Sequence, residues 1–177
     1  MFIVDFQGFE CGSSGFLCRE IAILNCENNF NQKHAFVDMP INIRYLNAQM
    51  SRQINWLTNN SHGLTHTNIV RGGGAGEEYD DLKMEHVSEW LNTFIRNNQN
   101  GLPLVAVKGL QKKEWLANLL RNVSIINLED EGCPNLENLR SLFKSFHCNN
   151  HFINGMNCSK EIVNHLYCWY TFCKRNE

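Results

Sequence analysis

MFIVDFQGF (residues 1–9) opens the chain with a short apolar run that ends near Gly8. β-Branched and aromatic residues dominate its first six positions, and such residues favour the pleated, half-buried surface of a sheet. These positions therefore predict a first strand over residues 1–6. One acid, Asp5, lies inside this run. A carboxylate at such a place either accepts hydrogen bonds from backbone amides or binds a cation.

Two further strands are predicted close behind the first. FLCREIAILNC (16–26) is rich in β-branched and aliphatic residues, and HAFVDMP (34–40) is a second apolar run that Pro40 stops. Short turns join all three segments, and strands joined in this way pair antiparallel. The first 40 residues therefore predict a three-strand antiparallel meander.

Beyond the meander the apolar period changes from two to about 3.6, which indicates helices. Leu46, Met50, Ile54 and Leu57 form one apolar stripe, and a second helix is predicted from about Tyr79 to Arg96. The glycine-rich stretch RGGGAG (71–76) between them is predicted to be a loop, because glycine loses the most backbone entropy in regular structure.

The rest of the chain alternates strands and helices. The apolar patterns predict strands over 102–109 and 123–128, and helices over 112–120, from Pro134 through Phe146, and over 159–173. A meander followed by β-α-β units implies an α/β fold. We therefore expect a mixed β-sheet, with a three-strand antiparallel meander plus parallel strands, flanked by helices.

Length and charge limit the class of protein. With 177 residues the chain is long enough for one domain, predicted to span residues 1–177. Its 16 Lys and Arg face 18 Asp and Glu, so no overall basic field marks a non-specific nucleic-acid coat. A basic leader and an 18-residue apolar run are both absent from the sequence, so we expect neither a signal peptide nor a membrane span. A cytoplasmic or nuclear protein is expected.

Eight cysteines are expected as thiols or metal ligands in such a reducing compartment. Near the end of the chain, CNNHFINGMNCS (148–159) contains the pattern Cys148-x-x-His151-x6-Cys158. Thiolate and imidazole are preferred zinc ligands, so this pattern predicts a metal site. His147 is an alternative ligand, and in a second interpretation the cysteines are ordinary small buried residues and His151 is a loop histidine.

The order of elements resembles the RNase H-like fold of the DEDD 3′–5′ exonucleases. That family carries Asp-x-Glu on its first strand and uses four carboxylates to hold two divalent cations. Here the motif is Asp5-Phe6-Gln7, and a neutral glutamine is a weak magnesium ligand. Lysines, including Lys108 and Lys112, occupy a second motif, and Ile162 occupies the position of the last aspartate. The resemblance implies that no catalytic set remains.

A subset of this fold, the domain of the Maelstrom proteins of the animal piRNA pathway, is more similar still. It has lost the exonuclease carboxylates and has a Glu-Cys-His-Cys zinc site. The matching residues here are Glu20 on the second predicted strand and Cys148, His151 and Cys158 near the last helix. The resemblance implies a structural zinc ion, because four protein ligands leave no position open for substrate. Metal binding would then be coupled to folding.

The same resemblance implies a function in single-stranded RNA binding, with protein partners of a small-RNA or transposon-silencing pathway. Lys108, Lys112, Lys113 and Arg121 are the locally basic residues predicted to contact phosphates. Ordinary solvated side chains are the alternative for each of them.

Two other functions stay open. The chain can be an active RNA nuclease, with Asp5 and a carboxylate of NLEDEG (127–132) or Glu161 in a rearranged metal site. It can also be a protein-interaction module, with Trp56 and HGLTH (62–66) at its surface.

Overall fold

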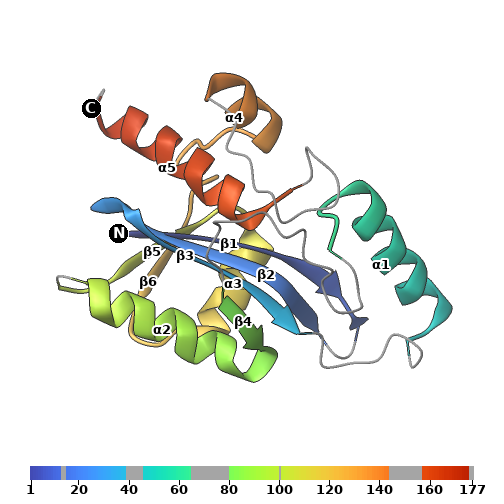
Figure 1. Cartoon of the computed structure of the whole chain (residues 1–177). Coiled ribbons are helices and arrows are strands. Elements are labelled where there is room, and N and C mark those ends of the chain that lie inside the picture. The colour runs from blue at the N-terminus through green and yellow to red at the C-terminus, as the bar shows by residue number, and fades with distance from the viewer. Residues whose placement is uncertain (13–14, 39–45, 65–79, 100, 144–156, 176–177) are drawn as a thin grey trace.

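Six strands form one β-sheet in the order β4-β3-β2-β1-β5-β6 (Figure 1). The structure is a computed structural model that describes residues 1–12, 15–38, 46–64, 80–99, 101–143 and 157–175. The strands are β1 (Phe2–Glu10), β2 (Phe16–Asn25), β3 (Asn28–Asp38), β4 (Asp80–Lys83), β5 (Leu104–Val107) and β6 (Ser124–Asn127).

The pairing confirms the predicted fold class. β1, β2 and β3 pair antiparallel in chain order, whereas β4 joins β3, β5 joins β1 and β6 joins β5 in parallel. Short turns allow the antiparallel pairs, while each parallel strand follows a connection that crosses over through a helix. The result is an α/β fold with a mixed sheet in an RNase H-like arrangement.

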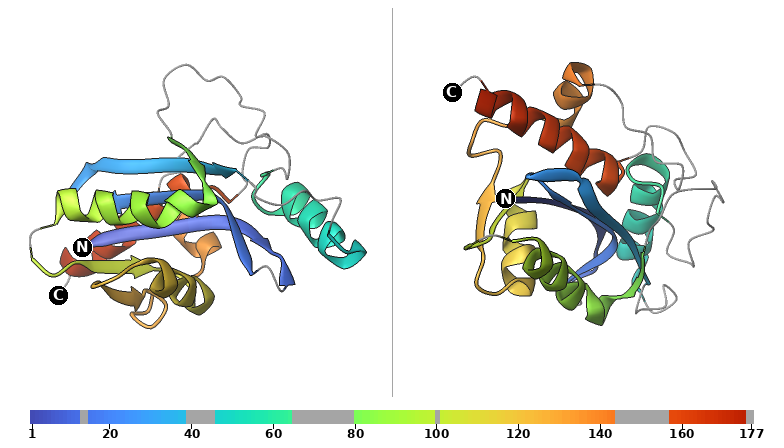
Figure 2. Two further views of the ribbon diagram at one scale, coloured as in Figure 1. Left: turned by 90° about the horizontal axis from the view of Figure 1, so that it is seen from below. Right: turned by 60° about the vertical axis from the view of Figure 1, so that its left-hand side comes forward.

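Helices cover both faces of the sheet. They are α1 (Ala48–Asn60), the 3₁₀ helix η3 (Met84–His86), α2 (Val87–Asn98), α3 (Leu110–Leu119), α4 (Leu136–Leu142) and α5 (Ser159–Arg175). Figure 2 shows α2 and α3 on one side of the strands and α5 on the other. α1 lies beyond one end of the sheet, where its Ile54 packs against Phe9 and Leu17. No helix within these described ranges is long and apolar enough to cross a membrane.

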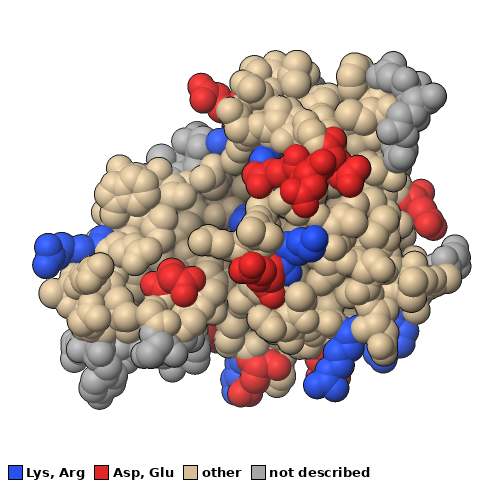
Figure 3. All heavy atoms as spheres, turned by 180° about the vertical axis from the view of Figure 1, so that it is seen from behind, with Lys and Arg blue, Asp and Glu red and all other residues tan. Residues whose placement is uncertain are grey.

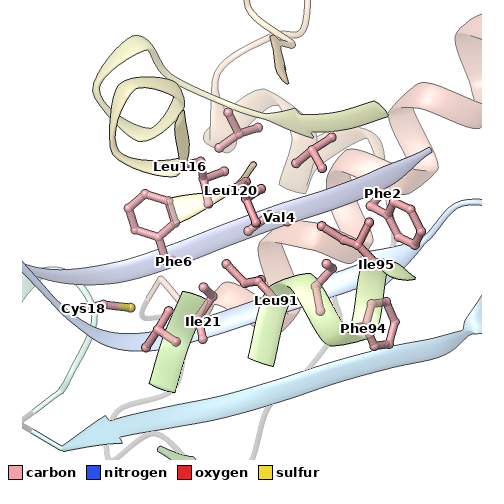
Figure 4. Close-up of a cluster of buried hydrophobic side chains, with 14 of the residues drawn as sticks. Phe2, Val4, Phe6, Cys18, Ile21, Leu91, Phe94, Ile95, Leu116 and Leu120 are labelled. Carbon is pink, nitrogen blue, oxygen red and sulfur yellow. The ribbon is translucent and has the colours of Figure 1, made fainter. Parts of the chain in front are cut away.

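Two apolar clusters hold these layers together. Phe2, Val4 and Phe6 of β1 point toward α2 and α3 and meet Leu91 and Leu116 there (Figure 4). The alternate side of the same strands packs against α5 through a separate set: Ile3, Ala22, Leu24, Val163 and Leu166. Successive strand residues face opposite sides of a sheet, so a single strand supplies both clusters.

The predicted helix from Tyr79 to Arg96 is wrong at its start. Residues 80–83 form β4 and 84–86 form η3, so the α-helix begins only at Val87. β4 exists because it pairs with Ala35–Asp38 and because the indole of Trp90 donates to the Asp80 carboxylate at 2.7 Å. These long-range contacts outweigh the helical pattern of the local sequence.

The bounds of β3 and α4 also differ from the prediction. β3 begins at Asn28, six residues before the predicted start, because its polar half continues the hairpin with β2. α4 spans only Leu136–Leu142: Asn135 caps it by accepting a hydrogen bond from the Asn138 amide, so Pro134 precedes the helix. The predicted continuation over 144–146, the RGGGAG stretch and Pro40 lie outside the described residues.

Candidate metal centre and nuclease-like face

A β-bulge decides which way Glu20 points. Gln7 pairs with Glu20 but the next residue, Gly8, pairs with Cys18, which leaves Arg19 as the extra residue of β2. A bulge shifts the alternation of side chains between the two faces. Glu20 consequently faces α5, whereas Cys18 faces the opposite cluster. Glycine is required at position 8, since a Cβ there would lie 2.1 Å from the Leu17 carbonyl oxygen.

Arg19 is buried in this bulge and helps to fix it. Its guanidinium donates a hydrogen bond to the carbonyl oxygen of Val37 on β3. Burial lowers the pKa of Arg19, and the nearby charge of Asp38 opposes that effect. The bulge is thus bonded to the neighbouring strand through a side chain.

Three potential metal ligands meet at Glu20. Glu20 Oε1 lies 2.7 Å from His34 Nε2 and 3.2 Å from Cys158 Sγ. Its second oxygen, Oε2, accepts a hydrogen bond from the Ser159 amide at 3.0 Å. One ligand atom from each of Glu20, His34 and Cys158 lies within 4.8 Å of the others, and all three residues are buried.

Different elements supply these groups. Glu20 is on β2, His34 is on β3, and Cys158 immediately precedes α5. In the β2–β3 register Glu20 pairs with Phe36 and Ala22 with His34, so Glu20 and His34 are diagonal neighbours on one face. The first amide of α5 points at the carboxylate, and the positive end of the helix dipole favours its charge.

The donor set could hold a metal ion. Zinc binds carboxylate, imidazole and thiolate at about 2.0–2.3 Å in a tetrahedron, which separates ligand atoms by about 3.5 Å. The 3.2 Å between Glu20 Oε1 and Cys158 Sγ is close to that spacing, whereas the 2.7 Å between Glu20 Oε1 and His34 Nε2 is a hydrogen-bond distance. Two buried atoms beside the cluster, His34 Nδ1 and Ser159 Oγ, make no hydrogen bond within the described part of the chain. Buried polar atoms are normally bonded, so this pocket is not satisfied by the described residues alone.

Of the four ligands predicted from the sequence, Glu20 and Cys158 are in contact. Cys148, His151 and the alternative ligand His147 lie outside the described residues, so their roles stay predictions. His34 was not predicted. A lone histidine in an apolar strand carries no ligand signal, and only the strand register brings it to Glu20.

Metal affinity is expected to fall 10- to 100-fold in His34→Ala, without being lost. If the four predicted residues complete the tetrahedron, His34 orients Glu20 from outside it, and partners of that kind have effects of this size. Titration of the apoprotein with zinc against a chromophoric chelator measures the change. Complete loss of zinc in His34→Ala, with retention in Cys148→Ser and His151→Asn, would instead make His34 a direct ligand.

The carboxylate of Asp5 lies on the same face, one strand away. Its Oδ1 accepts a hydrogen bond from Lys112 Nζ at 2.5 Å, and its Oδ2 accepts one from Gln7 Nε2 at 3.0 Å. Lys112 comes from the first turn of α3, and its ammonium group also lies 5.3 Å from the ring centroid of Phe6. Since Gln7 pairs with Glu20, the Asp5 group adjoins the candidate metal centre.

Asp5 is only 1% exposed, and this burial raises its pKa. The charge and hydrogen bond of Lys112, together with the hydrogen bond from Gln7, act in the opposite direction. The ammonium group of Lys112 therefore lies beside the Asp5 oxygen that a divalent ion would contact. This ion pair joins residues 107 positions apart in the chain.

The four predicted phosphate-binding residues do not form one patch. Lys108 follows β5 and pairs with Glu129 at 2.6 Å, and Lys113 adjoins Lys112 in the first turn of α3. Arg121 lies beyond the other end of α3, before β6. From Lys113 to Leu119 the helix rises about 9 Å, and Arg121 lies beyond that end, so it is separated from the three lysines.

Two carboxylates proposed for the rearranged nuclease site, Glu129 and Glu161, each contact a basic side chain. Glu129 contacts Lys108, and Glu161 accepts from Arg140 Nε at 3.1 Å and contacts His165 Nε2 at 3.4 Å. Burial alone would raise the pKa of Glu161, but His165 and Arg140 together hold it below its usual range. Among the described residues, Glu20, His34 and Cys158 form the one cluster of three candidate ligands.

The surface predicted around HGLTH is only partly exposed. Trp56 is 60% exposed on α1, whereas His62 is buried against Phe9, with 5.1 Å between ring centroids. His66 lies outside the described residues. On the face opposite to that of Figure 1, basic and acidic side chains are interspersed and form no continuous basic surface (Figure 3).

Comparison of the chain with family models, with curated proteins and with solved structures found no match.

Proposed function

We propose that this chain is a catalytically degenerate nuclease-fold domain of the Maelstrom type, which binds single-stranded RNA and uses zinc as a structural ion. The observation that carries the proposal is the ion pair of Lys112 with Asp5 at 2.5 Å. It replaces the cation of a nuclease with a side chain of the protein.

Two-metal catalysis needs several carboxylates that converge on ions about 4 Å apart. On this face Asp5 is neutralised by Lys112, and its neighbour Gln7 is uncharged. A divalent ion beside Asp5 would meet both the ammonium group and a buried carboxylate whose ionisation is disfavoured. The domain therefore retains the framework of a nuclease without its metal chemistry.

The RNA surface we propose is the edge of the sheet where β5 ends and α3 begins. Ligands of α/β folds bind beyond the carboxyl ends of parallel strands, and Lys108, Lys112 and Lys113 lie there. Lys113 makes no ion pair within the described ranges, so its charge is available to a phosphate. Lys108 and Lys112 add positive potential even while each contacts a carboxylate.

In this proposal the zinc ion has a mechanical role. It joins the β2–β3 pair to the start of α5 through Glu20 and Cys158, with the predicted Cys148 and His151 as the other ligands. A closed four-ligand site of this kind stabilises the fold and does not activate water.

Binding of a fluorescent 20-nucleotide single-stranded RNA is expected to weaken about 10-fold in Lys113→Glu and to depend less steeply on salt. Fluorescence anisotropy at several salt concentrations measures both effects. Lys83→Glu is the matched control, because Lys83 is an exposed lysine on β4 at the far edge of the sheet.

Equal affinities for the two variants would contradict the RNA surface. Magnesium-dependent degradation of the same RNA, abolished in Asp5→Ala, would contradict the loss of catalysis and favour the nuclease.

A further inference from the structure

A second candidate binding site lies at the other end of α3. A cavity of about 390 Å³ opens between α2, the end of α3 and the start of β6. Residues that matter for its chemistry are Ile95, Arg96, Leu119, Arg121, Asn122 and Val123. We name it the Arg96–Arg121 cavity.

Charge is the first distinctive property of this cavity. Two arginines line it, and no Asp or Glu does. Neither guanidinium has a carboxylate partner in the part of the chain that the structure describes; Arg96 donates only to Thr93 Oγ1, at 3.2 Å. Most other basic groups that border the sheet are paired, such as Lys33 with Asp80 and Lys112 with Asp5. Two unpaired guanidinium groups around one hollow favour an anion, and their planar forks match phosphate.

Shape is the second property. Ile95 is buried, and Leu119 and Val123 are partly buried; these apolar side chains line the cavity together with the polar Ser88, Asn92 and Gln99. At its rim Asn122 adopts φ of 58°, a left-handed conformation that asparagine tolerates in tight turns. A volume of about 390 Å³ lies within the range of small-molecule sites. Apolar and amide side chains beside a pair of arginines suit a ligand with both a planar ring and a phosphate group.

We infer that the Arg96–Arg121 cavity binds the phosphate monoester of a nucleotide, with the phosphate between the guanidinium groups and the base or sugar against the apolar and amide side chains of the lining. A free nucleoside monophosphate and the 5′-phosphorylated end of an RNA share this chemistry. The inference does not rest on the proposed RNA surface, because the cavity and Lys113 lie at opposite ends of α3.

NMR titration of the whole chain with uridine 5′-monophosphate tests this site. Saturable shifts are expected for the arginine side-chain signals and for residues 119–123, with uridine at least 10-fold weaker because it lacks the charged contacts. Arg121→Gln is expected to weaken the nucleotide about 10-fold or more. Arg52→Gln, an exposed arginine on α1, is the control and should bind as the unchanged protein does.

Of the two arginines, Arg121 is the better one to replace in this binding test. Arg96 lies in the last turn of α2, where a basic residue also stabilises the helix end, so its replacement has a second effect. Arg121 is exposed and outside any helix, and thermal unfolding of Arg121→Gln should match that of Arg52→Gln.

Single-stranded RNA with either a 5′-phosphate or a 5′-hydroxyl separates the two sources of the phosphate. A preference for the 5′-phosphate that Arg121→Gln removes identifies an RNA end, whereas nucleotide binding without that preference identifies a free nucleotide. No saturable binding at millimolar nucleotide, or equal affinities of Arg121→Gln and Arg52→Gln, would overturn the inference. The effect of Lys113→Glu on RNA binding tests the proposed RNA surface and does not bear on nucleotide binding in the Arg96–Arg121 cavity.

Discussion

Protein purified without chelators is expected to carry about one zinc ion per chain, and Cys158→Ser is expected to remove it and to destabilise the fold by several kcal/mol. Cys158 and Glu20 are buried in contact with each other, so without the ion the buried Glu20 carboxylate loses a cationic partner. Structural zinc sites contribute apparent binding free energies of about 10–16 kcal/mol, and this energy becomes folding energy.

Elemental analysis gives the metal content, and thermal unfolding with and without a strong chelator gives the coupling to stability. Cys168→Ser, on α5, is the control: its thiol is partly buried and is not one of the three clustered ligands, and burial raises its pKa, which disfavours a metal-binding thiolate. A zinc-free protein that unfolds cooperatively at an unchanged temperature would contradict the metal centre. Equal loss of zinc in Cys168→Ser and Cys158→Ser would contradict the ligand assignment.

Patterns that are local in the chain predicted most of the fold. The apolar runs of β1, β2, β5 and β6 and the helical stripe of α5 identify their elements without tertiary information. β4 was predicted as part of a helix, since its four residues are held by β3 and by the Asp80–Trp90 hydrogen bond, neither of which is local. The start of β3 was missed because its residues are polar and show no apolar run, although they pair with β2 in a hairpin.

The residues of the candidate site also include some that the sequence identifies and others that only the structure reveals. Glu20 and Cys158 could be selected through a family resemblance, and the structure brings them into contact. His34 could not, because its approach to Glu20 depends on the β2–β3 register. The bulge at Arg19 was equally hidden, although it determines the direction of Glu20. Residue types suggest possible ligands, whereas the strand register decides which of them meet.

Lys112→Met is expected to destabilise the protein by about 3–5 kcal/mol at neutral pH, because it leaves the buried Asp5 carboxylate without its ion-pair partner. Replacing the acid as well, in Asp5→Asn with Lys112→Met, should recover most of that loss. Urea unfolding of the two single variants, the double variant and the unchanged protein gives the coupling energy as a double-mutant cycle.

The pH dependence of the stability lost in Lys112→Met shows whether the loss comes from the ion pair or from packing of the Lys112 side chain. Lys112 lowers the pKa of Asp5, so without it the pKa, already raised by burial, rises further. An acid whose pKa is higher in the folded state than in the unfolded state costs stability only above its unfolded pKa, and the cost grows as pH rises through the folded value. The defect of Lys112→Met should therefore shrink as the pH falls toward the ordinary range of an aspartate.

Lys113→Met, a neighbour without an ion pair in the described chain, should show neither the defect nor its pH dependence. A coupling energy below about 0.5 kcal/mol, or a defect independent of pH, would mean that Lys112 does not act as the substitute for a metal ion beside Asp5.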